Sequence, residues 1–514
     1  MPEPGGDVRF RVWAPKARTV DVRIGGETHP LALEAEGVFA GAFRAKPGED
    51  YLYVLDGRRE LPDPCSRFQP EGNEGPSRIV ELPPAARRGL SLEDLVIYEL
   101  HVGTFSEEGT FDGVVPYLAE LRELGVTAIE VMPIATFPGE RGWGYDGLYI
   151  GAPHPAYGGP DGLARLVDAA HREGLGVILD VVYNHLGPGS EAITAFGPYV
   201  TDRHETFWGD ALDFREWGAR EWAIQNACMW VEEYGIDGLR LDAVHAIFDD
   251  SPRHVLAELA DRVHARPPRA LVISETSIDD ERPIEEWGHD ARWADGLHHA
   301  LHALLTGERD GYYAPYGSVR DVADELGRRP PERHVVCAQN HDQVGNRAVG
   351  DRLPSELLRL ASAVVLFAAQ TPLLFMGEEY GEPNPFQFFT DHTDPVIAEA
   401  TREGRKKEFA AYSAFSREDV PDPQDPETFR RSKLSRRGQP RVAEGDPVSR
   451  PGVGRFAADA SGSQLRDHYR RLLALRRRLP RDVRVEWDGQ TLTMRRGDAV
   501  LAVDFAAKTL ELHE

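Results

Sequence analysis

The sequence has very few cysteines, and they do not form a ligand pattern. Cys65, Cys228 and Cys337 are the only three in 514 residues, an odd number with wide spacing. A disulfide framework needs paired cysteines, and a structural metal site needs closely spaced cysteine or histidine ligands. We therefore expect no disulfide scaffold, no metal and no cofactor, and a reducing cytoplasm is the simplest compartment.

A long apolar run is also missing. Hydrophobic residues make up 41% of the chain, but no stretch approaches the ~20 apolar residues that a membrane-spanning helix needs. The opening "MPEPGGDVRFRVW" lacks the charged and apolar segments of a secretory signal, and it does not resemble a transit peptide. These absences predict a cytoplasmic protein without a membrane partner.

Positive charge is scarce as well. The chain has 59 lysines and arginines against 85 aspartates and glutamates, which gives a formal net charge of −26. Such a surface repels nucleic acids and anionic membranes. The acidity therefore predicts a neutral or weakly charged substrate and no nucleic-acid partner, although keeping the protein soluble is an equally good reason for it.

The two ends of the chain are predicted to be β domains. Residues 1–88 contain short alternating runs, such as "VRFRVW" and "DYLYVLDG", which are separated by Gly, Pro and Asp. This pattern is typical of a small immunoglobulin-like β-sandwich. Residues 481–514 alternate again around an Asp-Gly turn, and they predict a short C-terminal β domain.

Residues 89–480 have a different hydrophobic pattern. Apolar runs, the first of them "LVIYEL", alternate with amphipathic stretches, which predicts parallel strands joined by right-handed helical crossovers. About eight such units favour an α/β fold of the (β/α)8 TIM-barrel type. An open doubly wound sheet is the alternative, but no glycine-rich phosphate motif follows the first run. A long insertion at 186–214 follows the third predicted strand, and residues from about 381 to 460 are predicted to be irregular.

Polar side chains gather where four of the predicted strands end. Catalytic groups of such barrels lie at the C-terminal ends of strands. A single Asp, Asn or His there is more often a turn former or a helix cap, and Asn340 fits that role. Several together are costly to bury unless chemistry uses them, so they predict an active site. The residues are Asp180, Asn184, His185, Arg240, Asp242, His245, Glu275, Asn340, His341 and Asp342.

Three carboxylates without a metal motif indicate glycoside hydrolysis. Arg240 lies two residues before Asp242 on the same face of a strand, so it would keep that carboxylate ionised and ready to attack an anomeric carbon. Glu275 follows the apolar "LVIS" and is better placed to protonate the leaving oxygen and then to activate water. If configuration is retained, Asp242 and Glu275 should lie about 5–5.5 Å apart.

Aromatic residues support a sugar site. The segment "ERGWGYDGLYIGAPHPAYGG" after the second predicted strand supplies Trp143, Tyr145, Tyr149 and Tyr157. Sugar rings stack on aromatic faces, but aromatic rings also pack loops. We expect Tyr145 and Trp143 to contact the substrate.

Four motifs, "DVVYNH", "GLRLDAVH", "ISE" and "QNHD", resemble in kind and order those of the α-amylase family, glycoside hydrolase family 13. The resemblance implies a retaining mechanism on α-glucosidic bonds, with Asp242 as nucleophile, Glu275 as acid/base and Asp342 as transition-state stabiliser. Further roles follow from it. Arg240, His185 and His341 would hold the sugar, Tyr145 would lie under it, Asp180 and Asn184 would be structural, and His245 and Asn340 join the substrate-binding candidates.

Within that family, two features are similar to the trehalose-releasing hydrolases. Gln343 follows the last catalytic aspartate, where branching enzymes usually have glutamate, and residues 388–434 carry further similar stretches. The resemblance implies cleavage of the α-1,4 bond next to the terminal trehalose of a maltooligosyltrehalose, in trehalose biosynthesis. It also implies functional coupling to a maltooligosyltrehalose synthase. Phe388 and Asp391, after the eighth strand, are predicted to line the space for trehalose.

Three alternatives stay open at this point. A branching or debranching enzyme would have the same fold and the same carboxylates. A catalytically dead glycan-binding protein is less compatible with the sequence, because all three carboxylates are present. The N-terminal sandwich resembles starch-binding modules, but a packing domain that shapes the edge of the cleft is the simpler interpretation.

Overall fold

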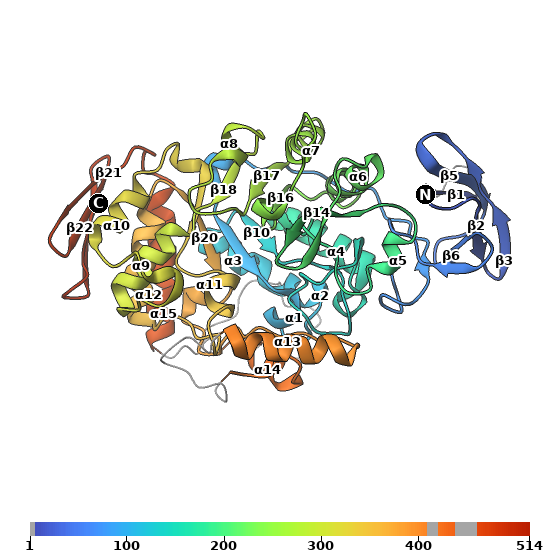
Figure 1. The fold of residues 1–514 in the computed structure, drawn as a ribbon. Coiled ribbons are helices and arrows are strands. Elements are labelled where there is room, and N and C mark those ends of the chain that lie inside the picture. The colour runs from blue at the N-terminus through green and yellow to red at the C-terminus, as the bar shows by residue number, and fades with distance from the viewer. Residues whose placement is uncertain (1–5, 409–419, 437–459) are drawn as a thin grey trace, which may run out of the picture.

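The computed structural model describes residues 6–408, 420–436 and 460–514. Figure 1 shows a central barrel with β-sheets on two opposite sides of it, one formed near the N-terminus and the other near the C-terminus. Within these ranges, no helix has the length and apolar character to cross a bilayer.

Eight parallel strands close into a barrel, which confirms the predicted fold class. Seven of them coincide with apolar runs of the sequence. The sixth was not predicted, because a strand of three residues has too little pattern to detect. In chain order the strands are β9 (Ile97–Leu100), β10 (Ala128–Val131), β13 (Gly176–Val181), β16 (Gly238–Leu241), β17 (Leu271–Ser274), β18 (Ala291–Trp293), β19 (His334–Cys337) and β20 (Thr371–Phe375).

The barrel interior has an apolar lower layer and a charged upper layer. Strand pairing sets Ile178 beside Gly238, and two residues further on it sets Asp180 beside Arg240. The neighbouring pair β9–β10 repeats this arrangement, with Glu99 beside Glu130 in the upper layer. Because side chains two apart on a strand share a face, the apolar layer at the bottom places these charged groups at the C-terminal rim.

Helices surround the barrel, and two of them, α9 and α10, lie in the sixth crossover. Helix α4 shows why they form, because Leu163, Leu166 and Val167 repeat at helical spacing and are buried, while Gly174 ends the helix in the left-handed region (φ 81°). The surrounding helices are α3 (Leu118–Leu124), α4 (Gly159–Glu173), α6 (Trp217–Glu233), α7 (Val255–His264), α9 (Gly296–Thr306), α10 (Val319–Leu326), α12 (Ser355–Phe367) and α15 (Ala460–Arg476).

Further helices lie in the connections, and two of them correct the expectation that residues 381–460 are irregular. Asp394 accepts a hydrogen bond from the Val396 N–H, and Asp425 accepts one from the Glu427 N–H, each directly before a proline. These Asp-Pro pairs are helix starts, because an N-cap aspartate and an N1 proline both favour a first turn. The rest of the region, 409–419 and 437–459, lies outside the described residues. These further helices are α1 (Val102–Phe105), α2 (Phe111–Val114), α5 (Glu191–Thr194), α8 (Arg282–Glu285), α11 (His341–Gly345), α13 (Pro395–Glu408) and α14 (Pro426–Arg431).

The N-terminal part forms the two predicted β-sheets. Their inner faces bury alternate residues such as Val8, Phe10 and Val12. One sheet has the order β1–β5–β4, and the other has β3–β2–β6–β7 with β8 beside β6. The strands are β1 (Asp7–Trp13), β2 (Val20–Ile24), β3 (Glu27–Pro30), β4 (Ala32–Leu33), β5 (Val38–Arg44), β6 (Asp50–Leu55), β7 (Arg59–Leu61) and β8 (Ser77–Arg78).

Trp13, at the end of β1, fixes these sheets to the barrel. Its ring lies so close to Gly197 and Gly218 that a β-carbon on either glycine would fall 2.5 Å or 1.9 Å from it. The ring also meets Tyr199 edge-on at 5.1 Å. The first turn of α6 therefore accepts the tryptophan only because residue 218 has no side chain.

Three further β elements complete the chain. The insertion after β13 contains α5 and the hairpin β14 (Val200–Thr206) and β15 (Gly209–Leu212), and β11 (Ala135–Thr136) pairs with β12 (Tyr149–Pro153). The C-terminal sheet is β21 (Arg484–Asp488), β22 (Thr491–Arg496), β23 (Ala499–Asp504) and β24 (Thr509–His513). Arg496 is buried and donates to the carbonyls of Phe367 and Ala368, which ties this sheet to the end of α12.

Gly218→Ala should destabilise the protein. Alanine normally stabilises a helix by up to ~1 kcal/mol relative to glycine, but here the methyl group would overlap the Trp13 ring, and we expect a loss of about 2 kcal/mol in the free energy of unfolding. Urea denaturation measures it. Gly404→Ala in α13 is the matched control, because nothing lies within 4 Å of the added carbon, and it should stabilise. In a Trp13→Ala background the cost of Gly218→Ala should shrink; an undiminished cost would contradict the contact.

Candidate active site

Arg240 is the centre of the charged layer. Its guanidinium is fully buried, and its Nη1 donates to both oxygens of Asp180 (2.9 and 2.8 Å) and to Asp242 (2.8 Å). Its Nη2 donates to Glu275 at 2.8 Å, and the ring of Trp293 lies 4.2 Å below the cation. One cation on β16 therefore holds carboxylates that follow or end three neighbouring strands, β13, β16 and β17.

Asp242 has both of its carboxylate oxygens fixed. Arg240 occupies Oδ1, and the Asn184 amide donates to Oδ2 at 2.6 Å. Asn184 was predicted to be structural, and the structure brings it into direct contact with Asp242. The next residue, Ala243, is in the left-handed region (φ 41°), a strained conformation for a residue with a β-carbon.

The strained backbone of Ala243 points its N–H at the carboxylate of Glu275. Its N–H donates to Glu275 Oε2 at 2.9 Å, the same oxygen that Arg240 contacts. Oε1 is left for another partner, and the Glu275 side chain is partly exposed. Asp342, at the start of α11, is also partly exposed, and its Oδ1 accepts from the Asn346 amide at 3.0 Å. Because Arg240 holds Asp242 and Glu275 together, the chemistry expected of a carboxylate pair is possible here; their separation of about 5–5.5 Å stays a prediction.

A second buried cation, His341, lies beside this cluster. Its Nδ1 contacts Glu99 at 2.5 Å and its Nε2 contacts the Tyr145 hydroxyl at 2.7 Å. Tyr145 in turn donates to Asp180 at 2.7 Å. Burial alone disfavours the imidazolium, but the carboxylates of Asp342 and Glu99 raise the pKa of His341 to about 10. His341 is therefore protonated at neutral pH and donates from both ring nitrogens.

Asp295 is a further carboxyl group of the site that the sequence did not reveal. It lies two residues beyond β18, and the Asn340 amide is 3.4 Å from its Oδ1. Burial and the nearby charges of Glu275 and Asp342 raise the pKa of Asp295 to about 7. Asp295 can therefore hold a proton next to the two catalytic candidates.

Three of the predicted contact residues have distinct surroundings. Asn340 caps α11 by accepting the Gln343 N–H at 2.8 Å, the role that its position also allowed. His245 is exposed at the rim. His185 is buried and stacks on Trp208, with ring centres 4.8 Å apart. Trp208 is 47% exposed, so the hairpin of the insertion brings an accessible aromatic ring to the site.

The aromatic candidates divide into two groups. Tyr145 reaches the charged layer, whereas Tyr149 and Tyr157 are buried, so for them the packing interpretation is the correct one. Trp143 is 5% exposed, lies edge-on to His341 and donates to the Gln387 carbonyl at 3.0 Å. Trp143 therefore packs against the His341 ring.

The loop after β20 lies against Trp143. The half-buried ring of Phe388 meets Trp143 edge-on at 5.2 Å, whereas Phe386 and Phe389 are fully buried. Asp391 is held by the Arg141 side chain at 2.5 Å and by the Glu140 N–H at 2.8 Å. Of this loop, Phe388 and Asp391 are the predicted residues that remain accessible.

Sequence reasoning missed Glu99, Trp293 and Trp208 as well as Asp295. Glu99 is the second-last residue of the first predicted strand, so the same search at strand ends would have found it. Trp293 and Asp295 belong to the undetected sixth strand and the residues just after it. No pattern in the sequence pairs Trp208 with His185, because the turn of the insertion hairpin sets that contact.

The fold and this site define a glycoside hydrolase of the α-amylase class. The family model described as "Alpha amylase, catalytic domain" matches residues 74–208. A crystal structure titled as a putative alpha amylase from Salmonella typhimurium is similar throughout, with a TM-score of 0.85, 35% identity, and coverage of 98% of this chain and 92% of that one.

Curated relatives assign the chain to one family within the α-amylase class of glycoside hydrolases. Malto-oligosyltrehalose trehalohydrolase from Saccharolobus solfataricus is 43% identical over 83% of this chain and 82% of its own length. The protein of the same name from Deinococcus radiodurans is 44% identical over 84% of this chain and 78% of its own length. The chain belongs to the malto-oligosyltrehalose trehalohydrolase family, and it is an enzyme of the glycosidase class.

Glu99→Gln should lower the pKa of His341. The amide keeps hydrogen-bonding atoms but removes a negative charge that stabilises the imidazolium, so the pKa should fall from about 10 toward the ordinary value near ~6.5. NMR titration of the imidazole carbons measures it. Glu123→Gln, on the exposed side of α3, is the control and should leave the value unchanged. A pKa that stays near 10 in Glu99→Gln would show that Glu99 does not stabilise this cation.

Proposed function

We propose that the protein is a retaining glycoside hydrolase that cleaves the α-1,4-glucosidic bond next to the terminal trehalose of a maltooligosyltrehalose. The products are trehalose and a maltooligosaccharide. The observation that carries this proposal is the single guanidinium of Arg240 that holds Asp242 and Glu275 side by side at the rim of the barrel. The names and identities of the relatives support the choice of substrate.

The first step uses Asp242 as the nucleophile. Arg240 and Asn184 fix both oxygens and so orient the carboxylate to attack the anomeric carbon. Glu275 gives a proton to the leaving oxygen from Oε1, because Oε2 is already occupied by Arg240 and the Ala243 N–H. A covalent glycosyl-enzyme forms as the trehalose side departs.

The second step reverses the proton transfer. Glu275, now ionised, takes a proton from water, the water attacks the anomeric carbon, and Asp242 leaves with the configuration retained. Asp342 faces the positive sugar of each transition state. The protonated His341 balances the charge of Asp342. A sugar hydroxyl that binds His341 shares the Nε2 proton with the Tyr145 hydroxyl. Tyr145, His185 and Trp208 form the aromatic surface on which that sugar lies.

The leaving side must accept two glucoses joined head to head. Phe388 and Asp391 line that space, and their contacts with Trp143 and Arg141 make this wall rigid. His245 and Asn340 complete the set of substrate-binding residues, and Asp180 orients Arg240. A branching or debranching enzyme is the alternative, which Gln343 after the last catalytic aspartate disfavours.

The wider biological setting belongs to the same proposal. The division into an N-terminal sandwich (1–88), a catalytic barrel (89–480) and a C-terminal β domain (481–514) follows the order of the sheets. The protein acts in the cytoplasm in trehalose biosynthesis, coupled to a maltooligosyltrehalose synthase that supplies its substrate.

Product analysis on maltotriosyltrehalose tests the activity. We expect trehalose and maltotriose, with the new reducing end released as the α-anomer in the proton NMR spectrum. Asp242→Ala should lower kcat by about 10⁴-fold or more, because the nucleophile is gone. Asp488→Ala, an exposed carboxylate of the C-terminal sheet, is the control. Branch transfer on amylose in place of trehalose release, or an active Asp242→Ala enzyme, would contradict the proposal.

Phe388→Ala and Asp391→Asn test the leaving-group wall. Loss of the ring or of the Arg141 contact should raise KM for maltotriosyltrehalose by about tenfold, with a smaller effect on maltopentaose, which lacks the trehalose end. Steady-state kinetics on both substrates measures the ratio. Trp487→Ala is the control, because that ring is 49% exposed on the C-terminal sheet. Unchanged trehalose release in both variants would remove these residues from the wall.

A further inference from the structure

Asp295 is a carboxyl group of the barrel rim that the proposed mechanism does not use. Ala291 and Trp293 of β18 belong to the apolar group inside the barrel, and so does Ile273 of the neighbouring strand β17, which pairs with Ala291. Side chains two apart on a strand share a face. Asp295, two residues after Trp293, and Glu275, two residues after Ile273, therefore continue the inward-facing rows at the rim.

The strand order places Asp295 between Glu275 and Asp342. Strand β18 pairs with β17 on one side and with β19 on the other. Glu275 directly follows β17, and Asp342 lies in helix α11, which follows β19. The Asn340 amide is 3.4 Å from Asp295 Oδ1, and the same Asn340 side chain caps α11. Asp295 is therefore a neighbour of both catalytic candidates.

Asp295 does not act as an ordinary helix cap. It occupies the N-cap position of α9, where an aspartate usually accepts a backbone N–H of the first turn, but its side chain makes no such bond. Its Oδ2 has no hydrogen-bond partner among the described residues, and the residue is partly exposed. The carboxyl group is therefore turned away from its own helix, and solvent can reach it.

Glu275 has contacts that favour its charged form. Arg240 and the Ala243 N–H both donate to its Oε2, and such donors stabilise a carboxylate more than a carboxylic acid. A general acid needs the opposite, because it must still carry a proton when the substrate binds. A negative charge beside Glu275 would supply what these donors remove, and Asp295 is in place to carry that charge.

The charges that face Asp295 act in opposite directions. Burial and the carboxylates of Glu275 and Asp342 raise the pKa of Asp295 to about 7. The cations Arg240 and His341 act against this rise, and the N-terminus of α9 also favours the charged form. The repulsion between Asp295 and its neighbouring carboxylates therefore outweighs the attraction of the cations.

The other titratable groups around Asp295 are neutral or paired. Burial raises the pKa of the Cys337 thiol, which stays protonated. Burial lowers the pKa of His299, one turn further along α9, to about 4, so this imidazole is neutral. Glu325 of α10 lies against the first turn of α9 and is paired with Arg328 at 2.7 Å. The balance at Asp295 is therefore set within the active site.

We propose that Asp295 is a positioning residue for the general acid, and that it shares one proton with Glu275. This role rests on the proposed function, in which Glu275 protonates the leaving oxygen. Two carboxyl groups on neighbouring strand ends repel each other when both are ionised, so the pair keeps one proton to a higher pH than Glu275 alone would. In the first step the proton passes from Glu275 Oε1 to the leaving oxygen, and in the second step water returns one to Glu275.

The pH dependence of kcat/KM on two substrates tests this role. The leaving oxygen of maltotriosyltrehalose needs a proton, so Asp295→Asn should move the alkaline limit of kcat/KM down by about one pH unit and lower kcat/KM about tenfold above it. Fluoride leaves without a proton, so kcat/KM for α-maltotriosyl fluoride should not change. Asp295→Ser should behave like Asp295→Asn, because both are favoured N-cap residues that keep α9 intact. Asp295→Glu should restore the limit.

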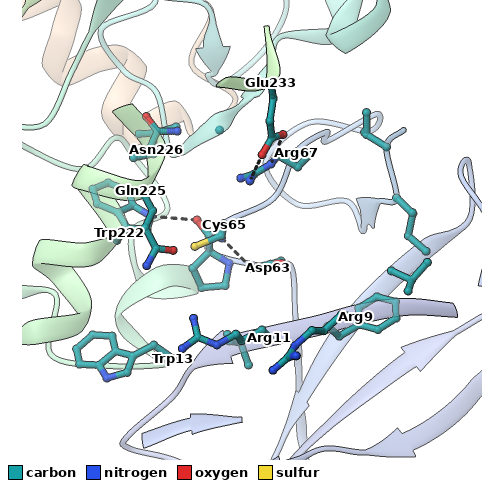
Figure 2. Close-up of a pocket in the computed structure, with 18 of the residues that line it drawn as sticks. Arg9, Arg11, Trp13, Asp63, Cys65, Arg67, Trp222, Gln225, Asn226 and Glu233 are labelled. Carbon is teal, nitrogen blue, oxygen red and sulfur yellow. Dashed lines mark hydrogen bonds and ion pairs between the residues drawn. The ribbon is translucent and has the colours of Figure 1, made fainter. Parts of the chain in front are cut away.

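Asp63→Asn is the matched control. Asp63 is also a buried carboxyl group whose pKa burial raises. It lies in the wall of a cavity of about 820 Å³ between the N-terminal sheets and α6, which none of the carboxylates around Arg240 lines (Figure 2). Its pH profile should match that of the wild type. An unchanged alkaline limit in Asp295→Asn and Asp295→Ser would overturn the proposed role. Equal losses on both substrates at every pH would overturn it too, because they would show a structural role only.

The role of Asp295 and the proposed function fail separately. If the wild-type enzyme does not release trehalose from maltotriosyltrehalose, the proposed function is wrong, and the comparison of maltoheptaose with the fluoride still tests Asp295. If trehalose is released but the alkaline limit does not move in the variants, only the role of Asp295 is wrong. Circular dichroism confirms that each variant is folded.

Discussion

The buried guanidinium of Arg240 is the group on which the site depends. It contacts Asp180, Asp242 and Glu275 at 2.8–2.9 Å, and it is not exposed at all. Burying a charge is unfavourable unless partners satisfy it, and here each partner is also unfavourable without the cation. The four groups therefore stabilise one another, and the barrel strands are held in the register that brings them together. One positive charge does not balance three carboxylates, and burial raises the pKa of Asp180 to about 7, so Arg240 holds Asp242 and Glu275 beside an acid that can take up a proton.

The remaining acids of the rim are balanced in two ways. His341 supplies a second cation for Glu99 and Asp342. Burial and the neighbouring charge of Glu99 raise the pKa of Glu130 well above its ordinary value, and the pKa of Asp295 rises to about 7. Glu130 is therefore protonated and uncharged, whereas Asp295 gains or loses its proton near neutral pH. The upper layer thus avoids the repulsion that so many carboxylates would otherwise cause.

The N-terminal sheets are linked to this layer through α6. Trp13 anchors β1 against Gly218 at the start of the helix, and Asn226 in the middle of it accepts a hydrogen bond from Tyr183. Tyr183 directly precedes Asn184, which fixes Asp242. The sheets and Asp242 are therefore linked through few covalent and hydrogen bonds.

What the sequence determined by itself was the set of features with a local signature. Seven strands, the insertion, the sheets at both ends and the polar residues at strand ends all follow from short periodic patterns and their order. Tertiary structure alone decided the rest. Glu99 and His341 are 242 residues apart, and only barrel closure brings them into contact. The sixth strand can be recognised only from its pairing with its neighbours. An Asp-Pro pair can end one helix or start another, and for the pairs before α13 and α14 the packing of the following turn decides which. Local sequence patterns specify helices and strands. The charge states of buried side chains and the shapes of cavities depend instead on residues distant in the chain, because only the folded structure decides which groups share a buried environment.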